Sequence, residues 1–387
     1  MTEATFFCPT ELICGFGVLD QLEDIVQSYG QKGLFVMDPF FLGSETESRI
    51  LNLLKGKDVL TYGRVTPNPR DTDINEGAAL CAGGLDFIVA LGGGSAIDTA
   101  KAINVVLTNG GSAWNYVKQV DRPMKEITKP LVPLIAIPTT AGTGTEATRY
   151  SVVTDALEHK KGTIKTDLIF PTKSLVDPEL MMSMPRKTTA LTAIDAFAHA
   201  FEAYIGSKAN VFSEMYSLQA MRLFARSALR ACEDGSDREA RLDMAMCSTL
   251  GGLAISHSAT TLPHGIGQAL SGVTDAPHGG SIAVCMANVV SWTLPECEEK
   301  FAETACLFDF TLKEKSVRKQ AEALPELLNK LFYRMIGEPV TMATYGLKEE
   351  QVEAVADMAM KNFFGDISRH PRKASRDDLM AIIRSCL

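Results

Sequence analysis

Four side chains in the second half of the chain have the residue types and spacing of a metal site. Asp195 and His199 lie four residues apart in an apolar stretch, 189–204, that is typical of a buried helix, and residues four apart share one helix face. His264 and His278 follow in two Pro-His-Gly sequences. A buried, ionised aspartate needs a compensating charge, which a metal ion supplies. For the first pair alone, an Asp–His hydrogen bond in a helical core is the alternative.

One carboxylate and three imidazoles form a donor set that suits Fe(II) or Zn(II) better than Mg²⁺ or Ca²⁺. An open coordination position would make the metal a Lewis acid toward an alcohol or carbonyl oxygen. His257 lies two helical turns before His264, and we expect a structural or supporting role for it. His159 and His370 lie among charged residues and are expected at the surface.

A glycine-rich turn in the first half can hold a phosphate. The sequence Leu91-Gly-Gly-Gly-Ser-Ala-Ile-Asp98 lies where a predicted strand passes into a predicted helix. Gly93 and Gly94 let the backbone approach a bulky anion. Ser95 is expected to cap the helix, whose N-terminus attracts negative charge. The sequence is not the GxGxxG fingerprint, and a plain tight turn with a helix cap is the alternative.

Two further polar positions follow predicted strands. The sequence Pro138-Thr-Thr-Ala-Gly-Thr-Gly-Thr-Glu146 follows one strand, and Asp38 follows another. Ligands of open α/β sheets bind at the carboxyl edge of the strands, so both positions favour a nucleotide. A carboxylate at Asp38 would bind ribose hydroxyls and repel a 2′-phosphate, which favours NAD over NADP. An Asp-Pro turn is the alternative.

The elements that must position these residues change type along the chain. In the first half, strands predicted at 33–37, 59–65, 85–91 and 131–137 alternate with helices predicted at 47–54, 72–82 and 95–106. This alternation indicates a mostly parallel sheet covered by helices. After Asp177-Pro178, helical stretches dominate. We therefore expect an α/β dinucleotide-binding domain over residues 1–180 and an all-helical metal-binding and substrate domain over residues 181–387.

Composition narrows the class of protein. The 387 residues are 46% hydrophobic and carry a formal net charge of −9, which argues against a nucleic-acid partner. The nine cysteines have no CxxC pair, as expected for reduced thiols. No apolar run reaches transmembrane length and no signal peptide is apparent, so we expect a cytoplasmic protein without a membrane partner.

In combination, these motifs resemble those of the iron-containing (group III) alcohol dehydrogenases, nearly end to end. The resemblance is carried by Gly92-Gly-Gly-Ser-x-x-Asp98-x-x-Lys101, the 138–146 loop, Asp177-Pro178, Asp195-x-x-x-His199 and the two later histidines. It implies a dehydroquinate synthase-like architecture. It also implies an NAD(H)-dependent enzyme that interconverts a small primary alcohol and its aldehyde, with Fe²⁺, or Zn²⁺ in some relatives, as a homodimer or higher homo-oligomer.

The resemblance assigns roles to matching positions. It implies that the metal ligands, which carry the catalysis, are Asp195, His199, His264 and His278. It implies that the residues at the cofactor are Asp38, Gly93, Gly94, Ser95, Asp98, Thr139, Thr140, Thr143 and Lys161. One position departs from the pattern, because many members carry a histidine where this chain has Gln268. Glutamine cannot exchange protons near neutral pH, so a relay through ribose hydroxyls and water, or a different substrate, is expected.

The sequence gives weaker indications for the substrate pocket than for the metal and the cofactor. Arg149 and Tyr150 follow the threonine-rich loop, and an arginine there would suit a polar or anionic aldehyde. A salt-bridged structural arginine is the alternative. Leu253 and Phe201 are candidates for apolar wall, and Gln268 completes the set of candidate substrate residues.

Three rival functions share some of these features. A dehydroquinate synthase-like lyase or a glycerol dehydrogenase-like enzyme would also bind NAD and a metal. The third is a non-enzymatic NAD-sensing protein, which would be expected to lack intact ligand positions. The spacing of the four ligands favours an alcohol dehydrogenase over all three.

Overall fold

The computed structural model describes residues 4–119, 123–157 and 160–387. The chain divides into two compact units. We call Cys8–Thr140 with Gly144–Met182 the α/β unit, and Ser183–Leu387 with Met1–Phe7 and Ala141–Thr143 the helical unit. His159, expected at the surface, lies outside the described residues.

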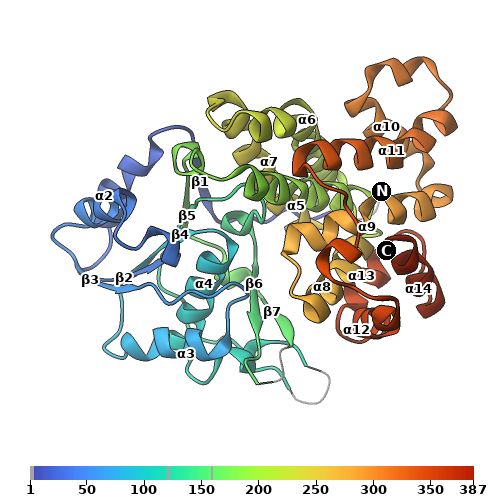
Figure 1. Cartoon of the computed structure of the whole chain (residues 1–387). Helices are drawn as coiled ribbons and strands as arrows, with labels where there is room; N and C mark the ends of the chain where they lie inside the picture. Colours follow the sequence, from blue (N-terminus) through green and yellow to red (C-terminus); the bar gives the residue numbers. More distant parts are fainter. Residues whose placement is uncertain (1–3, 120–122, 158–159) are drawn as a thin grey trace. The chain divides into compact units, whose positions relative to one another are not determined.

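The α/β unit is built on a six-stranded parallel sheet with strand order β1-β8-β5-β4-β2-β3 (Figure 1). Its strands are β1 (Glu11–Cys14), β2 (Lys32–Met37), β3 (Asp58–Tyr62), β4 (Phe87–Gly92), β5 (Leu134–Pro138) and β8 (Lys173–Val176). An antiparallel hairpin of β6 (Tyr150–Thr154) and β7 (Lys161–Lys165) stands apart from the sheet. The predicted α/β class of this part of the chain is confirmed.

Both faces of the sheet are buried, so its central strands are apolar throughout. In β2, Leu34 and Val36 pack in the cluster that contains residues of α3 (Asp71–Leu80) and α4 (Gly94–Asn109). Phe35 and Met37 belong to the opposite cluster, with residues of α1 (Leu22–Gln27) and α2 (Glu45–Leu53). Successive side chains of a strand point to opposite faces, and continuous apolar runs are typical of such doubly covered sheets.

Two strands of the sheet and the hairpin were not predicted. β1 and β8 have only four residues each, and a four-residue run contains too little periodicity to distinguish it from a loop. The strands pair with each other, and β8 also pairs with β5. Tertiary pairing rather than local pattern therefore defines this side of the sheet.

Helix α4 holds the α/β unit together through a buried lysine. Lys101 is 1% exposed, and its Nζ donates to the backbone carbonyls of Thr145 at 2.7 Å, Thr148 at 2.9 Å and Tyr150 at 2.9 Å. One turn earlier, Asp98 accepts from Thr145 Oγ1 at 2.6 Å and from the Val152 amide at 2.8 Å. The loop after β5 and the start of β6 are thereby fixed to the helix that follows the glycine turn.

The helical unit contains the remaining long helices, as predicted for the second half of the chain (Figure 1). They are α5 (Arg186–Ile205), α6 (Val211–Glu233), α7 (Arg238–His257), α8 (Leu262–Thr274), α9 (His278–Thr293), α10 (Glu298–Phe308), α11 (Val317–Ile336), α12 (Val352–Asn362), α13 (Phe364–Arg369) and α14 (Arg376–Ser385). The helical stretches read from the sequence did not include α8, α10, α13 or α14. In α8, a proline and three glycines oppose helix formation. Packing against α9 and α12 compensates for this weak propensity.

The expectation that His370 is a surface residue is wrong. His370 is fully buried, with Nε2 2.7 Å from Thr293 Oγ1 and Nδ1 3.2 Å from Thr261 Oγ1. Burial lowers the pKa of this imidazole to about 3, so it is neutral near pH 7. The prediction relied on the charged residues next to His370 in the sequence. The His370 side chain, directly after α13, turns into the core, whereas those of its charged neighbours do not.

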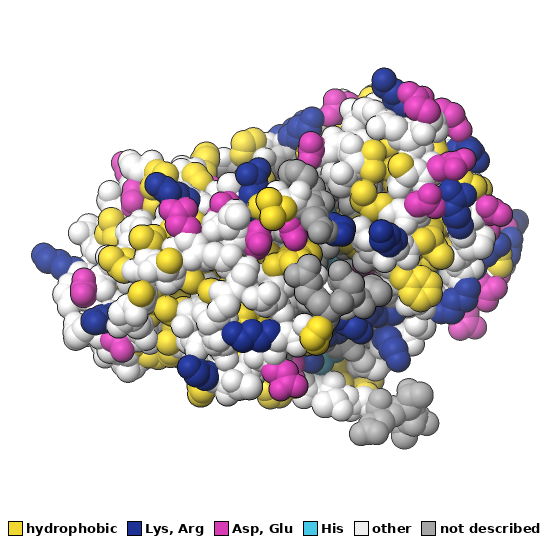
Figure 2. Space-filling model, turned by 90° about the horizontal axis from the view of Figure 1, so that it is seen from below, with side chains coloured by type: hydrophobic (Ala, Val, Ile, Leu, Met, Phe, Trp, Pro, Cys, Tyr) yellow, Lys and Arg dark blue, Asp and Glu magenta, His cyan; other side chains and the backbone are white. Residues whose placement is uncertain are grey.

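On the face drawn in Figure 2, side chains of both charge signs are interspersed. All nine cysteines are free thiols. Among the residues described, none of the helices combines the length and the apolar character needed to cross a membrane.

Replacing Lys101 with methionine should destabilise the α/β unit by about 3–5 kcal/mol, because it leaves a buried carboxylate and several carbonyls without their cation. Urea unfolding followed by circular dichroism measures the change. Lys55→Met, at an exposed lysine of the same unit, should stay within about 0.5 kcal/mol of the wild type. Equal stability of the two variants would contradict the role assigned to Lys101.

Candidate metal centre and cofactor edge

The four side chains singled out in the sequence converge in the helical unit. Asp195 and His199 lie on one face of α5, His264 lies in the first turn of α8, and His278 is the first residue of α9. One potential ligand atom from each lies within 4.8 Å of every other. Asp195 Oδ1 is 3.7 Å from His199 Nε2, 3.6 Å from His264 Nε2 and 3.4 Å from His278 Nε2.

These separations are at or beyond the limit of a hydrogen bond, and they match neighbouring ligands of one cation. Around a tetrahedral ion with bonds of about 2.1 Å, ligand atoms lie about 3.4 Å apart. Asp195 Oδ1 and His264 Nε2 are both buried and make no hydrogen bond within the structure. Because buried polar atoms are nearly always paired, two such atoms facing each other fit a site built for a divalent metal ion.

Two of the imidazoles are hydrogen-bonded through Nδ1, which leaves Nε2 facing the other side chains of the cluster. His199 Nδ1 is 3.3 Å from the Gly142 carbonyl oxygen, which can only accept. His264 Nδ1 is 2.6 Å from Glu202 Oε1. A proton on each Nδ1 leaves a lone pair on each Nε2, directed toward Asp195, as metal ligation requires.

Glu202 is the residue of this site that the sequence reasoning missed. It is fully buried on α5, seven residues after Asp195 and three after His199. Residues spaced by three and four share a helix face, so the pattern Asp195-x-x-x-His199-x-x-Glu202 contained the signal. A second carboxylate on the ligand face of an apolar helix was the feature to notice.

Close helix crossings hold the ligands in place. A Cβ atom on Gly279 would overlap the Leu191 carbonyl oxygen, and one on Gly251 would lie 3.3 Å from the Cβ of His199. Glycines at these two positions let α9 and α7 approach the ligand helix α5. The backbone spacing that brings the ligands together therefore depends on residues without side chains.

The electrostatics of the cluster favour a cation. Burial alone would raise the pKa of Asp195, but the surrounding histidines outweigh it and hold the pKa below its usual range. Burial opposes protonation of His264, yet Glu202 and Asp195 together raise its pKa to about 10. Burial lowers the pKa of His199. Two buried carboxylates thus create a negative potential that stabilises positive charge in the cluster. The cluster is open to solvent at His278, because 38% of that side chain is exposed.

The cofactor candidates of the α/β unit gather at one edge of the sheet. Strands β2, β4 and β5 are adjacent, and the residues that follow them meet: the Asp38 amide donates to the Leu91 carbonyl at 2.9 Å, and the Thr139 amide donates to the Gly92 carbonyl at 3.0 Å. The strand order reverses between β2 and β4, and open α/β sheets bind ligands at such a switch point.

The glycine turn is shaped for a close backbone approach. Gly92 has φ +147°, and a Cβ there would lie 2.8 Å from the Cβ of Asp38. A Cβ on Gly93 would lie 3.2 Å from Thr140 Oγ1. The amides of Gly94 and Ser95 begin α4 at this edge of the sheet and have no carbonyl one turn earlier in the helix to bond, whereas the Ala96 amide donates to the Gly93 carbonyl. The space and the donors fit a pyrophosphate at the N-terminus of a long helix.

The expected capping role of Ser95 is wrong. Helix α4 begins at Gly94 and its N-cap is Gly93, with no side-chain cap, so half-buried Ser95 lies inside the first turn. The helix starts earlier because the glycines adopt the turn without help from a hydroxyl. Asp38 caps the short helix that follows β2, accepting from the Phe40 amide at 2.9 Å.

The remaining cofactor candidates occupy different places. Both oxygens of Asp98 are hydrogen-bonded inside the α/β unit. Lys161 begins strand β7 and is half-buried. Thr140 is half-buried directly after β5, whereas Thr143 belongs to the segment assigned to the helical unit. Direct contacts from these four residues to a cofactor stay predictions.

Of the two candidates for a polar substrate contact, Arg149 is paired with a carboxylate and Tyr150 packs its ring against a lysine. Arg149 Nη1 is 2.7 Å from Asp167 Oδ1, and the guanidinium lies over the Phe170 ring. The amine of Lys165 lies over the Tyr150 ring. Arg149 therefore fits the alternative given in the sequence analysis, a salt-bridged structural arginine.

The three candidates in the helical unit differ in exposure. Phe201 is fully buried and stacks between Phe197 and Phe301, so it is core rather than pocket wall. Leu253 is 6% exposed. Half-buried Gln268 lies one turn after His264 on the same face of α8.

His257 lies outside the cluster, as expected. Its Nδ1 is 2.7 Å from the Leu253 carbonyl, its Nε2 is 3.0 Å from the Phe7 amide nitrogen, and its ring stacks on Phe6. These contacts attach the N-terminal segment to α7. His257 is therefore structural.

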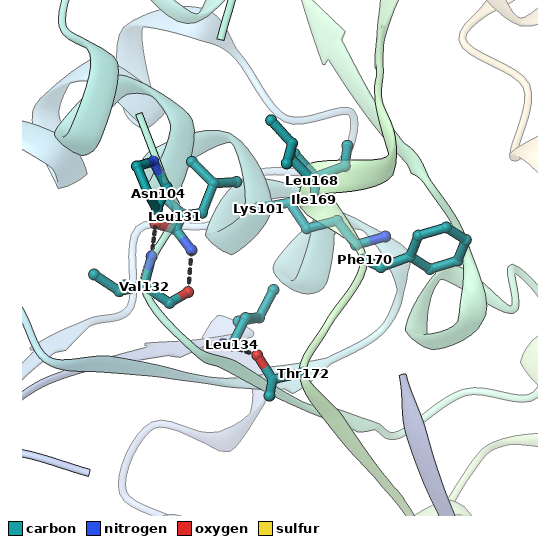
Figure 3. A pocket seen from close by; sticks show the side chains of 10 residues that line it. Lys101, Asn104, Leu131, Val132, Leu134, Leu168, Ile169, Phe170 and Thr172 are labelled. Carbon is teal, nitrogen blue, oxygen red and sulfur yellow. Dashed lines mark hydrogen bonds between the residues drawn. The ribbon is translucent and has the colours of Figure 1, made fainter. Parts of the chain in front are cut away.

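A cavity of about 240 Å³ lies beside α4 in the α/β unit (Figure 3). Asn104 both donates to and accepts from the backbone of Val132, at 2.8 and 3.1 Å, and Thr172 Oγ1 accepts from the Leu134 amide. Lys101 is saturated by the carbonyls described above. The side-chain amide of Asn104, the Thr172 hydroxyl and the Lys101 amine in this cavity are thus already engaged.

Comparison with known proteins agrees with this geometry. A sequence profile of the iron-containing alcohol dehydrogenases matches residues 9–178, and the profile of the C-terminal part of that family matches residues 189–387. The chain is 33% identical to an NAD-dependent methanol dehydrogenase from Bacillus methanolicus, over 99% of both chains.

Solved structures give the same result. A crystal structure of a 1,3-propanediol oxidoreductase superposes with a TM-score of 0.93 at 32% identity, covering 100% of both chains. A sulfoacetaldehyde reductase from Bifidobacterium kashiwanohense, solved with NAD⁺, superposes with a TM-score of 0.89 at 26% identity, covering 100% of this chain and 99% of the other. The chain therefore belongs to the iron-containing alcohol dehydrogenase family.

Proposed function

We propose that Asp195, His199, His264 and His278 bind one divalent cation, Fe²⁺ or alternatively Zn²⁺, at which an alcohol and its aldehyde are interconverted with NAD(H). The observation that carries the proposal is the buried Asp195 oxygen, which lies 3.4–3.7 Å from three imidazole nitrogens and lacks a hydrogen bond. As a member of its family, the chain is an NAD-dependent alcohol dehydrogenase.

The sheet edge is the proposed cofactor site. Gly93, Gly94 and Ser95 would contact the pyrophosphate, with Thr139, Thr140, Thr143 and Lys161 along the cofactor. Asp38 would accept from the ribose hydroxyls, because it follows β2 beside the glycine turn. For Asp98 we propose a positioning role, since both of its oxygens fix the neighbouring loop.

The residues of the chain supply binding, orientation and charge. When bound, the metal supplies a Lewis acid for the substrate oxygen, and the nicotinamide accepts or donates the hydride. Asp195 carries the balancing negative charge, and Gly142 and Glu202 fix the tautomers of two ligands. Gln268, one turn beyond His264, can hydrogen-bond a substrate or a water molecule but cannot transfer a proton near neutral pH.

The pairing of Arg149 bears on the substrate class, because it leaves this arginine committed to another residue. Since Arg149 is paired with Asp167, we favour a small uncharged primary alcohol and its aldehyde over an aldehyde with an anionic tail. The sulfoacetaldehyde reductase among the similar structures keeps a polar aldehyde as the second candidate. Assembly as a homodimer or higher homo-oligomer and a cytoplasmic location stay predictions.

Asp195→Ala and His264→Ala should each lose the metal and the activity. Lewis-acid stabilisation contributes several kcal/mol to the barrier, so turnover should fall by about a thousandfold or more. Elemental analysis of protein purified without oxygen, with NADH oxidation by a panel of aldehydes, measures both quantities.

The matched control is His257→Gln, which changes a histidine outside the cluster and should retain both metal and activity. An Asp195→Ala enzyme that turns over at the wild-type rate without metal would rule out the proposed centre.

Asp38→Asn should weaken the preference for NADH over NADPH. Hydrogen bonds to a charged group contribute about 1.5–3 kcal/mol, so kcat/KM for NADH should fall by about 10- to 100-fold. The value for NADPH should not fall, because a repulsive charge is removed. Asp24→Asn, at an exposed aspartate of α1, is the control. An unchanged ratio of the two kcat/KM values would exclude Asp38 from the ribose site.

A further inference from the structure

Glu202 joins two ligand-bearing helices at a single carboxylate. It lies on α5, next to Asp195 and His199, yet its carboxylate accepts hydrogen bonds from the start of α8. Oε1 accepts from His264 Nδ1 at 2.6 Å. Oε2 accepts from the Thr261 amide at 2.6 Å and from Thr261 Oγ1 at 3.1 Å.

These bonds make Glu202 the cap of α8. Thr261 occupies the N-cap position but makes no side-chain cap of its own, because its hydroxyl points to Glu202. The His264 amide also lies 3.5 Å from Oε2, at the limit of a hydrogen bond. First-turn amides have no acceptor inside their helix, and here a carboxylate from another helix, favoured by the helix dipole, accepts from them.

The same carboxylate determines what His264 can offer to a metal. A carboxylate can only accept, so the proton of the imidazole is held on Nδ1 and the lone pair on Nε2 faces Asp195 at 3.6 Å. Such carboxylate–imidazole pairs orient metal ligands and make them more basic. Glu202 is 0% exposed, so solvent does not screen this interaction.

The charges in the core also balance. Asp195 and Glu202 bring two negative charges into the core beside the imidazoles, and a divalent cation bound by neutral imidazoles would offset both. A neutral side chain at position 202 would leave a net positive charge in the core, which is costly to bury.

We propose that Glu202 is a positioning residue that sets the metal affinity of the site, by locking the Nδ1–H tautomer of His264 and supplying the second compensating charge. This inference rests on the proposed metal centre. It goes beyond that centre because Glu202 is not one of the four proposed ligands and acts through its hydrogen bonds to His264 and Thr261.

Zn²⁺ titration of the metal-free protein against a chromophoric chelator tests the proposal. The wild type should bind one Zn²⁺ per chain, and E202Q should bind it about 10- to 100-fold more weakly. The matched control is E303Q, which removes a carboxylate that accepts from the Tyr204 hydroxyl on the same helix α5; its Zn²⁺ affinity should equal that of the wild type.

The possible outcomes are distinct. A wild type that binds no stoichiometric Zn²⁺ refutes the proposed metal centre itself. Tight binding by both the wild type and E202Q overturns only the role of Glu202. An E303Q affinity as weak as that of E202Q also overturns it, since the effect would then be a general consequence of losing a glutamate beside α5.

A second measurement keeps the proposal testable if E202Q does not fold. NMR of the Zn²⁺-loaded wild type labelled with ¹⁵N-histidine should place the proton of His264 on Nδ1, in a far-downfield resonance typical of a carboxylate hydrogen bond. A His264 protonated on Nε2, with Nδ1 toward the metal, would overturn the inference.

Discussion

The burial of one ionised carboxylate is the constraint on which the helical unit depends. Asp195 is 3% exposed in the middle of an apolar helix, and an isolated charge there would cost far more than the fold can supply. Three imidazoles face it, and two of them are held in the required tautomer by acceptors behind them. Under the proposed function, a cation rather than a hydrogen bond would offset the cost of burying Asp195, and the helices bring the four side chains together for it.

The arrangement needs close packing as well as the right donors. Helices α7 and α9 approach α5 at Gly251 and Gly279, where a Cβ would be tightly packed against α5 at Gly251 and would overlap it at Gly279. Helix α8 is a poor helix by composition, and it is held at its start by Glu202 and along its length by a hydrophobic cluster. In the α/β unit, Lys101 plays the corresponding part, because it fixes the loop after β5 to the helix that begins at the glycine turn.

Much of the site could be predicted because its signals are either short spacings within one element or several motifs that occur together. The four-residue spacing of Asp195 and His199 places them on one helix face, and apolar runs followed by polar turns predict the sheet edge that brings Asp38 and Gly93 together. The later histidines were grouped with this pair because one carboxylate and three imidazoles suit a metal, and the resemblance of whole motifs assigned them as ligands, since nothing in local spacing connects His264 to α5.

What the sequence did not reveal depends on tertiary contacts. His370 is buried because its segment turns into the core, although its neighbours in sequence are charged. Arg149 pairs with Asp167, which is a choice between partners that the sequence cannot rank. The partner of Glu202 lies 62 residues away, and strands β1 and β8 are paired although each is too short to show a pattern.

The most direct test is anomalous X-ray diffraction at the iron absorption edge, on crystals of protein purified without oxygen and active in aldehyde reduction. We predict one peak per chain, within bonding distance of Asp195, His199, His264 and His278. An active crystal form with no peak among these four side chains, at the iron edge or at the zinc edge, would contradict the account.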